Sequence, residues 1–515
     1  MAIFVPPFRL ILSLALSMCH EKCCRCLQRA FLPMNRSQPK RLHGLYVITD
    51  ESKSDVLFSR VESALRGGAR IIQYRAKAKT ETERLNEAQR IKALCSRFEA
   101  LFIVNDDPAL CIACDADGVH LGAQDMSVAE ARALLGPQRL IGTSNRTVDQ
   151  AVTSQRLGAD YIAVGSIYLT GTKSDAVHVG LETLRAVRQA VTLPLVAIGG
   201  IDRDGAGAAI DAGADAVAVI SAVMGDASPN MAAREFALLF NRLQPWPRGR
   251  TLTIAGSDSG GGAGIQGDLK TITLLGSYGM SAITALTAQN SLGVSGVHAV
   301  PTEFVAAQIE AIFSDLPPDV IKTGMLFNGE IASLVGRLLV EKGLPAVVDP
   351  VMIAKGGAVL LQLEALEILR RDLLPGSYLL TPNLPEAEAL TGLPVQNEAD
   401  MEQAVYRLQE MGARNVLLKG GHLQGEAVDL LLDGNRLHRL AVKRSVSRNT
   451  HGTGCTYASA IAALLARGLP LPVAVNRAKK FITSAIETAR EMGAGHGPVN
   501  HFVAGRKHWS ENPQS

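Results

Sequence analysis

The sequence predicts two successive α/β domains: a (β/α)8 TIM barrel, then an open, mainly parallel α/β sheet. The chain has 515 residues, which is too long for one ordinary hydrophobic core. Between residues 45 and 221, eight short apolar runs are separated by helical patterns, and strands and helices alternate again beyond residue 251. Glycine is abundant and aromatic residues make up only 4%, which suits close packing of helices on parallel strands.

The composition excludes several classes of function. The net charge is +3 and no basic block is interleaved with aromatic residues, so we expect no nucleic-acid partner. Four of the eight cysteines lie in the first 33 residues, which leaves Cys95, Cys111, Cys114 and Cys455 in the body of the chain. These four offer no disulfide framework, which indicates a reducing compartment and a cytoplasmic protein. Cys111 and Cys114 form a C-x2-C pair without the second pair that zinc needs, so we expect packed thiols.

Residues 1–42 are predicted to be an N-terminal extension outside both domains. Their apolar stretch of about a dozen residues is too short to span a bilayer, so we expect no membrane association. The segment also lacks the clear small-residue cleavage site of a signal peptide. We interpret it as an upstream extension of a reading frame whose working start is Met34. The competing interpretation is a genuine disordered tail.

The barrel is predicted over residues 43–243, where each apolar run supplies one strand. In order, the eight runs read LYVIT, RIIQYR, LFIVN, GVHLG, RLIGTS, YIAVG, PLVAIGG and AVAVIS. Active sites of this fold lie at the C-terminal ends of the strands, and polar residues of this sequence fall there. Two carboxylates and three cations follow the strands: Asp106, Asp125, Arg75, Lys77 and Lys173. Together they fit a magnesium-bound diphosphate.

A second phosphate site is predicted on the same rim. Gly199 and Gly200, with the backbone at Ile220 and Ser221, match the site that barrels often build from their seventh and eighth loops. Two phosphate sites that face one another indicate an enzyme that joins two phosphorylated molecules.

The segments LYVITD, QYRAK, VNDD, LTGTK and AIGGI resemble thiamine phosphate synthase, and the resemblance extends over residues 43–240. It implies coupling of hydroxymethylpyrimidine diphosphate to a thiazole phosphate, with release of pyrophosphate. It implies catalytic roles for Arg75 and Lys173, and Mg2+ ligation by Asp106 and Asp125. The residues implied to bind the pyrimidine diphosphate are Gln73, Tyr74, Arg75, Ala76, Lys77, Asn105, Ser144 and Lys173. Those implied to bind the thiazole phosphate are Thr170, Gly171, Thr172, Gly200, Ile220 and Ser221.

Two departures from the family pattern leave its charged groups in place. They are GAQD, where Gly-Gln is commoner, and Leu169, where proline is common. A related barrel, the thiazole tautomerase, shares the fold but need not hold a diphosphate. The intact set of carboxylates and cations argues against that alternative.

Residues 244–250 are predicted to be a linker, because two prolines and a glycine follow an amphipathic helix. The second domain is predicted over residues 251–505, followed by a tail at 506–515. Its opening strand runs into a glycine-rich turn that lacks both GxGxxG in its usual place and GxxxxGK[ST]. Glycine content there is therefore weak evidence for a nucleotide loop.

The strand ends of the second domain carry a different polar set. Asp349, Asn383, Glu386 and Lys419 follow successive strands, and HGTGC opens a late helix with free backbone N–H groups. Taken singly, Glu386 is equally well explained as part of a helix cap. The combination predicts a site for Mg2+ and ATP, with ATP as co-substrate.

These segments, with AQNS and GHGPVNHF, resemble hydroxymethylpyrimidine/phosphomethylpyrimidine kinase of the ribokinase-like superfamily. The resemblance implies that one pocket phosphorylates a hydroxymethyl group and then the phosphate just attached. The residues implied to contact the pyrimidine are Gly256, Asp268, Gln289, Met325, Val351 and Cys455. Those assigned to phosphate and ATP are Asp349, Asn383, Glu386, Lys419, Gly452, Thr453 and Gly454.

Cys455 stands where a phosphotransferase usually has a carboxylate. A fixed carboxylate would help the first transfer but repel the phosphate acceptor of the second. We therefore hypothesise that a helix N-terminus lowers the thiol pKa toward neutrality, which makes Cys455 a compromise base. The alternative is that Cys455 only packs and positions the substrate.

The two predicted activities fit together, because the kinase product is what the barrel consumes. We therefore expect a bifunctional enzyme of thiamine biosynthesis that acts on small-molecule substrates as a homo-oligomer. Two alternatives remain open. One is a pyridoxal-type vitamin kinase joined to a tautomerase-like barrel, and the other is a non-catalytic sensor of the pathway.

Overall fold

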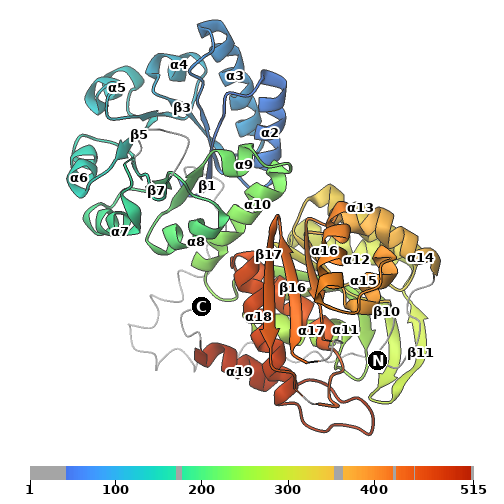
Figure 1. Cartoon of the computed structure of the whole chain (residues 1–515). Helices are drawn as coiled ribbons and strands as arrows, with labels where there is room; N and C mark the ends of the chain where they lie inside the picture. The colour runs from blue at the N-terminus through green and yellow to red at the C-terminus, as the bar shows by residue number, and fades with distance from the viewer. Residues whose placement is uncertain (1–41, 170–176, 353–362, 422–424, 446, 512–515) are drawn as a thin grey trace, which may run out of the picture. The chain divides into compact units, whose positions relative to one another are not determined.

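The computed structural model describes residues 42–169, 177–352, 363–421, 425–445 and 447–511 (Figure 1). Almost all of the predicted N-terminal extension, including Met34, lies outside these ranges. So do four predicted site residues, Thr170, Gly171, Thr172 and Lys173.

The first domain is a closed barrel of eight parallel strands, as predicted, in the order β1 to β8. The strands are β1 (Gly44–Ile48), β2 (Ile71–Tyr74), β3 (Leu101–Asn105), β4 (Gly118–Leu121), β5 (Leu140–Asn145), β6 (Tyr161–Val164), β7 (Leu195–Ile198) and β8 (Ala216–Val219). Strand β8 pairs with β1 in the register Gly44 to Ala216, which closes the barrel.

Helices surround the barrel (Figure 1). They are α2 (Ser54–Arg66), α3 (Glu81–Arg97), α4 (Pro108–Ala113), α5 (Val128–Leu135), α6 (Val148–Arg156), α7 (Gly180–Ala190), α8 (Arg203–Asp211), α9 (Ser221–Met224), α10 (Pro229–Leu239) and the 3-10 turn η1 (Phe240–Leu243). Side chains alternate along each strand, so one set fills the barrel and the other packs under the helices. Tyr46, Ile103 and Tyr161 belong to the inner cluster, and Ile72 and Val104 to the outer one.

The second domain is a nine-stranded sheet in the order β11-β10-β9-β12-β13-β14-β15-β16-β17. The strands are β9 (Arg250–Asp258), β10 (Tyr278–Asn290), β11 (Gly293–Ala299), β12 (Val320–Thr323), β13 (Ala346–Val348), β14 (Leu379–Leu380), β15 (Asn415–Lys419), β16 (Ala427–Asp433) and β17 (Arg436–Val442). Strands β10, β9, β12, β13, β14 and β15 run parallel, while β11, β16 and β17 are antiparallel to their neighbours. The prediction of a mainly parallel sheet is confirmed.

Helices cover both faces of this sheet. They are α11 (Gly264–Leu274), α12 (Thr302–Asp315), α13 (Gly329–Lys342), α14 (Leu363–Ile368), α15 (Leu384–Thr391), α16 (Glu398–Glu410), α17 (Thr453–Ala466), α18 (Leu471–Glu487) and α19 (His501–Glu511), with the short turns η2 (Leu369–Leu373) and η3 (Leu374–Gly376). One apolar cluster joins the sheet to α12, α13, α15 and α16, and another joins it to α11, α17 and α18. Helix α17 is buried on nearly all sides, as its small apolar residues require.

The chain end differs from the predicted tail. Helix α19 continues to Glu511, so the first six residues of the segment 506–515 are helical. The Trp509 indole N–H donates to the carbonyl oxygen of Leu274 at 2.8 Å, which anchors α19 to α11.

Candidate active sites

Two carboxylates meet at the C-terminal rim of the barrel. Asp106 follows β3 with a positive φ of 63°, a conformation that Asp tolerates better than most residues. Burial raises the pKa of Asp106 to about 6, and a hydrogen bond and charge repulsion from Asp125 add to this effect. The Asn105 side chain and the charge of Lys77 act in the opposite direction. Carboxylates forced together in this way fit a divalent cation, which would relieve their repulsion.

No larger metal cluster occurs in the part of the chain that the structure describes, where no three His, Cys, Asp or Glu side chains gather as ligands. Mg2+ commonly needs no such cluster, because it keeps part of its water shell and binds through one or two carboxylates and substrate phosphates.

Arg75 and Lys77 lie directly beyond β2. The backbone N–H of Arg75 donates to Thr49 Oγ1 at 2.9 Å, and that of Lys77 donates to Glu51 Oε1 at 2.8 Å. These bonds fix the backbone, while neither side chain forms an ion pair with any described residue. Both cations therefore remain available to an anionic ligand.

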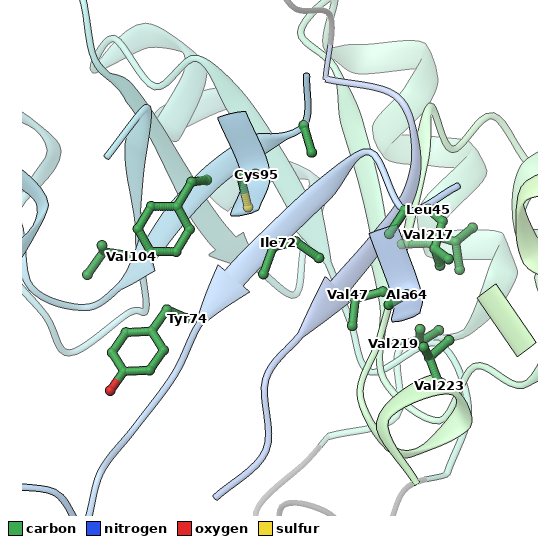
Figure 2. Packing of buried hydrophobic residues seen from close by; sticks show 14 of the residues in the cluster. Leu45, Val47, Ala64, Ile72, Tyr74, Cys95, Val104, Val217, Val219 and Val223 are labelled. Carbon is green, nitrogen blue, oxygen red and sulfur yellow. The ribbon is translucent and has the colours of Figure 1, made fainter. Parts of the chain in front are cut away.

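The Tyr74 side chain points away from this site, so only its backbone could contact a ligand there. Its ring packs in the outer core with Ile72 and Val104 (Figure 2). Its hydroxyl donates to Glu87 Oε2 at 2.7 Å, on the helix side of β2. The reason is strand alternation, because Gln73 points into the barrel and its neighbour must then point outward. The partly buried Ala76 also packs against the outer core, so only its backbone can serve a ligand.

A chain of hydrogen bonds, which we call the interior chain, crosses the barrel interior. It runs from Gln73 through Tyr46, Tyr161 and His120 to Ser144, with lengths of 2.9, 3.1, 3.0 and 2.9 Å. The two ends are predicted site residues, but the three central members are not among the predicted ones. Side chains alternate between inward and outward along β1, β4 and β6, and the inward positions of these three residues were a signal that could have identified them.

At the predicted second phosphate site, two glycines let the backbone pass close to a neighbouring segment. Gly199 and Gly200 have φ values of 97° and 65°. A Cβ at Gly200 would lie 2.4 Å from the carbonyl oxygen of Leu169, so no larger residue fits without rearrangement. Ile220 precedes α9 and Ser221 begins it. These four residues therefore present backbone groups at the ends of β7 and β8.

The second domain contains a cavity of about 630 Å³ at the carboxyl ends of its parallel strands. Nearly all site residues predicted for this domain line it. They are Gly256, Gln289, Met325, Asp349, Val351, Asn383, Glu386, Lys419, Gly452, Thr453, Gly454 and Cys455. Topology thus brings residues nearly 200 positions apart in the sequence to one site.

One predicted residue, Asp268, lies behind this cavity rather than in it. It is fully buried. Its carboxylate accepts hydrogen bonds from Lys322 Nζ at 2.7 Å, Thr253 Oγ1 at 2.6 Å and Ser459 Oγ at 2.5 Å. This observation corrects its assignment to the pyrimidine, because both carboxylate oxygens are occupied by protein donors.

Two carboxylates and a lysine form one charged group in the cavity. Lys419 Nζ lies 2.7 Å from Asp349 Oδ1, and Thr381 donates to the same oxygen at 3.1 Å. Burial raises the pKa of Glu386 to about 7; the Asp349 charge adds to this, while the Lys419 charge opposes it. Glu386 and Asn383 also form the capping box of α15, so the helix-cap explanation is confirmed alongside their place in the cavity.

The N-terminus of α17 faces this charged group. Gly452 has a φ of 80°, and a Cβ there would lie 1.8 Å from the carbonyl oxygen of Gly262. A Cβ at Gly454 would lie 3.3 Å from Asp349 Oδ2 and 3.6 Å from Lys419 Nζ. No side chain of a described residue caps the helix. The Thr453 N–H makes a long bond of 3.4 Å to the carbonyl oxygen of Thr450, while the next N–H groups, of Gly454 and Cys455, can bind a phosphate beside Lys419.

The structure contradicts the expected acidity of Cys455. Burial raises the pKa of its thiol to about 11; the charge of Lys322 and the Gly264 N–H act in the opposite direction, and the charges of Asp268 and Asp349 add to the rise. Loss of hydration is the largest of these effects. Without ligands, Cys455 is a neutral thiol at neutral pH, which favours the positioning role over the base.

His451 and Asp258 are further cavity residues that are not among the predicted ones. His451 Nε2 lies 2.8 Å from Asp258 Oδ2 and 3.3 Å from the side-chain nitrogen of Gln289. Burial opposes ionisation of Asp258, but hydrogen bonds from His451 and from the Ala263 and Gly260 N–H groups leave its pKa lowered. The signal in the sequence was the histidine that directly precedes the predicted phosphate loop.

The fold and site define the chain as a two-domain enzyme: an α/β phosphotransferase joined to a TIM barrel with carboxylates and cations at its rim. Comparison with known proteins gives two family matches, Thiamine monophosphate synthase over residues 45–223 and Phosphomethylpyrimidine kinase over residues 258–500. The Thiamine biosynthesis bifunctional protein ThiED of Geobacter sulfurreducens is 53% identical over 465 residues, which cover 90% of this chain and 94% of that protein. The chain therefore belongs to the family of bifunctional thiamine-biosynthesis enzymes that combine thiamine phosphate synthase with hydroxymethylpyrimidine/phosphomethylpyrimidine kinase.

Single-domain proteins also match. The Hydroxymethylpyrimidine/phosphomethylpyrimidine kinase of Streptomyces coelicolor is 51% identical over 250 residues, covering 48% of this chain and 93% of that protein. The structure of Bacillus subtilis pyridoxal kinase with ADP is 38% identical, with a TM-score of 0.47, and covers 49% of this chain and 97% of that one. The family membership confirms the predicted pair of activities and does not favour the tautomerase or sensor alternatives.

A search of the described helices for a membrane span gave none of sufficient length and hydropathy.

Proposed function

We propose that the kinase domain uses ATP to phosphorylate 4-amino-5-hydroxymethyl-2-methylpyrimidine twice. We further propose that the barrel couples the resulting diphosphate to the thiazole phosphate. The observation that carries this proposal is the pair of separate anion sites, one at the barrel rim and one beside α17. Each combines carboxylates with cationic or backbone N–H donors, as transfer of phosphorylated groups requires.

In the kinase domain, we assign the pyrimidine to the end of the cavity that contains Gly256, Gln289, Met325 and Val351. Gln289 carries both a donor and an acceptor, which match the edge of an aminopyrimidine. Asp349, Asn383, Glu386 and Lys419 face the nucleotide phosphates. Asp349 and Glu386 would hold a bound Mg2+, which would supply charge neutralisation for these phosphates. Lys419 and the first N–H groups of α17 stabilise the transferring phosphoryl group.

In the barrel, Arg75 and Lys77 hold the diphosphate, with Asn105 beside Asp106. Asp106 and Asp125 would ligate Mg2+, which supplies charge neutralisation for the departing pyrophosphate. The C–O bond then breaks early, and the aminopyrimidine ring delocalises the positive charge until the thiazole nitrogen attacks. The thiazole phosphate lies against Gly200, Ile220 and Ser221. By the family resemblance, Thr170 to Lys173 complete the two subsites.

We also propose that the protein acts in the cytoplasm as a homo-oligomer. The absence of a disulfide framework among the cysteines of residues 43–515 supports the first proposal. The second rests on the general rule that soluble oligomers are mostly built from copies of one chain.

A kinase assay tests the proposed substrate. Purified full-length protein should consume two ATP for each pyrimidine alcohol converted and release the diphosphate. Pyridoxal, offered at the same concentration, should be phosphorylated at least about 100-fold less efficiently, because a buried polar edge built for an aminopyrimidine is left unpaired by another ring. Equal efficiency with pyridoxal, or arrest after one transfer, would contradict the proposal.

A further inference from the structure

The interior chain of the barrel has a property beyond holding its members in place. Both of its ends, Gln73 and Ser144, are residues we assign to the pyrimidine subsite. The three central members, Tyr46, His120 and Tyr161, are each less than one-tenth exposed. The chain therefore connects two substrate-facing groups through the interior of the protein, with little access to water.

The phenols of the interior chain remain protonated at physiological pH. Burial raises the pKa of Tyr46 above its usual value, more than its hydrogen bonds to Tyr161 and Gln73 lower it. Burial likewise raises the pKa of Tyr161, and the neighbouring Tyr46 adds to the effect. Each hydroxyl therefore contributes one proton and can donate only one hydrogen bond along the chain.

Because each hydroxyl donates only once, the hydrogen bonds of the interior chain all point in one direction. In the structure Gln73 Nε2 donates to the Tyr46 hydroxyl. The one arrangement in which both phenol protons then find an acceptor has Tyr46 donating to Tyr161, and Tyr161 donating to Nδ1 of His120. An imidazole that accepts at Nδ1 carries its proton on Nε2, so His120 donates to Ser144 Oγ in this arrangement.

The direction determines what each end offers to a ligand. The Gln73 side-chain oxygen accepts no hydrogen bond from any residue that the structure describes, so it remains an acceptor. Ser144, whose oxygen accepts from His120, keeps its proton as a donor on the exposed side. If every bond reversed, Gln73 would present its NH2 group and Ser144 a lone pair. Mixed arrangements would leave the proton of a buried phenol without an acceptor, which is costly.

We propose that Tyr46, Tyr161 and His120 are positioning residues that fix Gln73 as an acceptor and Ser144 as a donor. They thereby select a ring with an exocyclic amino N–H over one with a carbonyl oxygen at the same position. This inference rests on the proposed function of the barrel. A 4-oxo ring would require Gln73 to turn its amide, and all four hydrogen bonds would have to reverse together.

Removal of the Tyr161 hydroxyl tests the proposal. In Tyr161→Phe the interior chain of hydrogen bonds is interrupted. Tyr46 can then turn its proton toward Gln73, while His120 and Ser144 keep their hydrogen bond. The measurement is kcat/KM for coupling with the 4-amino pyrimidine diphosphate and with its 4-oxo analogue, at saturating thiazole phosphate. We expect the preference for the amino ring to fall about 10-fold, as for loss of one oriented hydrogen bond.

Two further variants make the result decisive. Tyr46→Phe interrupts the interior chain at its next member. It should lower the preference for the 4-amino over the 4-oxo ring to a similar degree. Tyr168→Phe is the matched control, because its hydroxyl donates to the carbonyl oxygen of Gly205 at 3.0 Å, outside the interior chain, and it should keep the full preference. Retained coupling of the 4-amino ring reports that the barrel of each variant is folded, and kinase activity reports the same for the second domain.

The outcomes separate the inference from the function on which it rests. An unchanged preference in both Tyr161→Phe and Tyr46→Phe, or an equal loss of rate with both rings, would overturn the selective role of the interior chain. Failure of the unaltered protein to couple the 4-amino diphosphate would instead overturn the proposed function itself.

Discussion

Substitution of Asp106 by Asn is expected to lower kcat for coupling by about 100-fold to 1000-fold, with kinase activity unchanged. The change preserves the size of the side chain and removes one of the two carboxylates assigned to Mg2+. Asp125 alone should hold the ion less tightly, so the Mg2+ concentration for half-maximal coupling should also rise. Both effects are measured as thiamine phosphate formation from the two phosphorylated substrates across a Mg2+ titration.

Asp115→Asn serves as the control for this variant. Asp115 lies in the same domain, and its side chain is 84% exposed and paired with Arg139. Asn tolerates its positive φ of 50°, so neither activity should change. Equal loss of coupling and kinase activity in Asp106→Asn would contradict separate sites in the two domains. Undiminished coupling would contradict the metal-binding role.

Substitution of Cys455 by Asp should separate the two phosphoryl transfers of the kinase domain. A carboxylate at this position would face the phosphate acceptor of the second step but only a neutral hydroxymethyl group in the first. Two like charges about 5 Å apart in a partly buried site repel by about 3 kcal/mol. We therefore expect the second step to slow about 100-fold more than the first, measured with the alcohol and the monophosphate as separate substrates.

Cys455→Ser is the matched variant, because it keeps a small neutral group at the N-terminus of α17. Since the raised thiol pKa leaves Cys455 neutral, Cys455→Ser should retain both transfers within about 10-fold and show an unchanged pH profile. If both steps lost activity together in Cys455→Ser, with a shifted pH profile, the thiol would act as a base after all. Equal slowing of both steps in Cys455→Asp would refute the charge argument.

The sequence was sufficient to predict both architectures, because the spacing of apolar residues and the alternation of strand and helix patterns can be read from neighbouring residues. Each barrel strand is a short apolar run that ends in polar or glycine residues, and all eight appear at their predicted places. The edges of the second sheet were harder to predict. Strand β11 is largely exposed and reads GVSGVHA, and β17 alternates polar and apolar residues as surface strands do, so neither forms an apolar run.

The site residues show the same division between local and tertiary information. Strand ends identified Asp106, Asp349 and Lys419, because parallel topology gathers such positions at one edge. The partner of Asp268 could not be read from the sequence, since Lys322 lies 54 residues away on another strand. The acidity of Cys455 depends on burial by elements from across the sheet, and a motif cannot report that burial.

The central claim is that the two domains act on the same pyrimidine ring in succession. The most direct test is one reaction that contains the full-length protein, ring-labelled pyrimidine alcohol, ATP, Mg2+ and thiazole phosphate. We predict that labelled thiamine phosphate accumulates, and that Asp106→Asn stops the label at the pyrimidine diphosphate. Label that remained in the alcohol, or a diphosphate that the unaltered barrel left unused, would contradict the account.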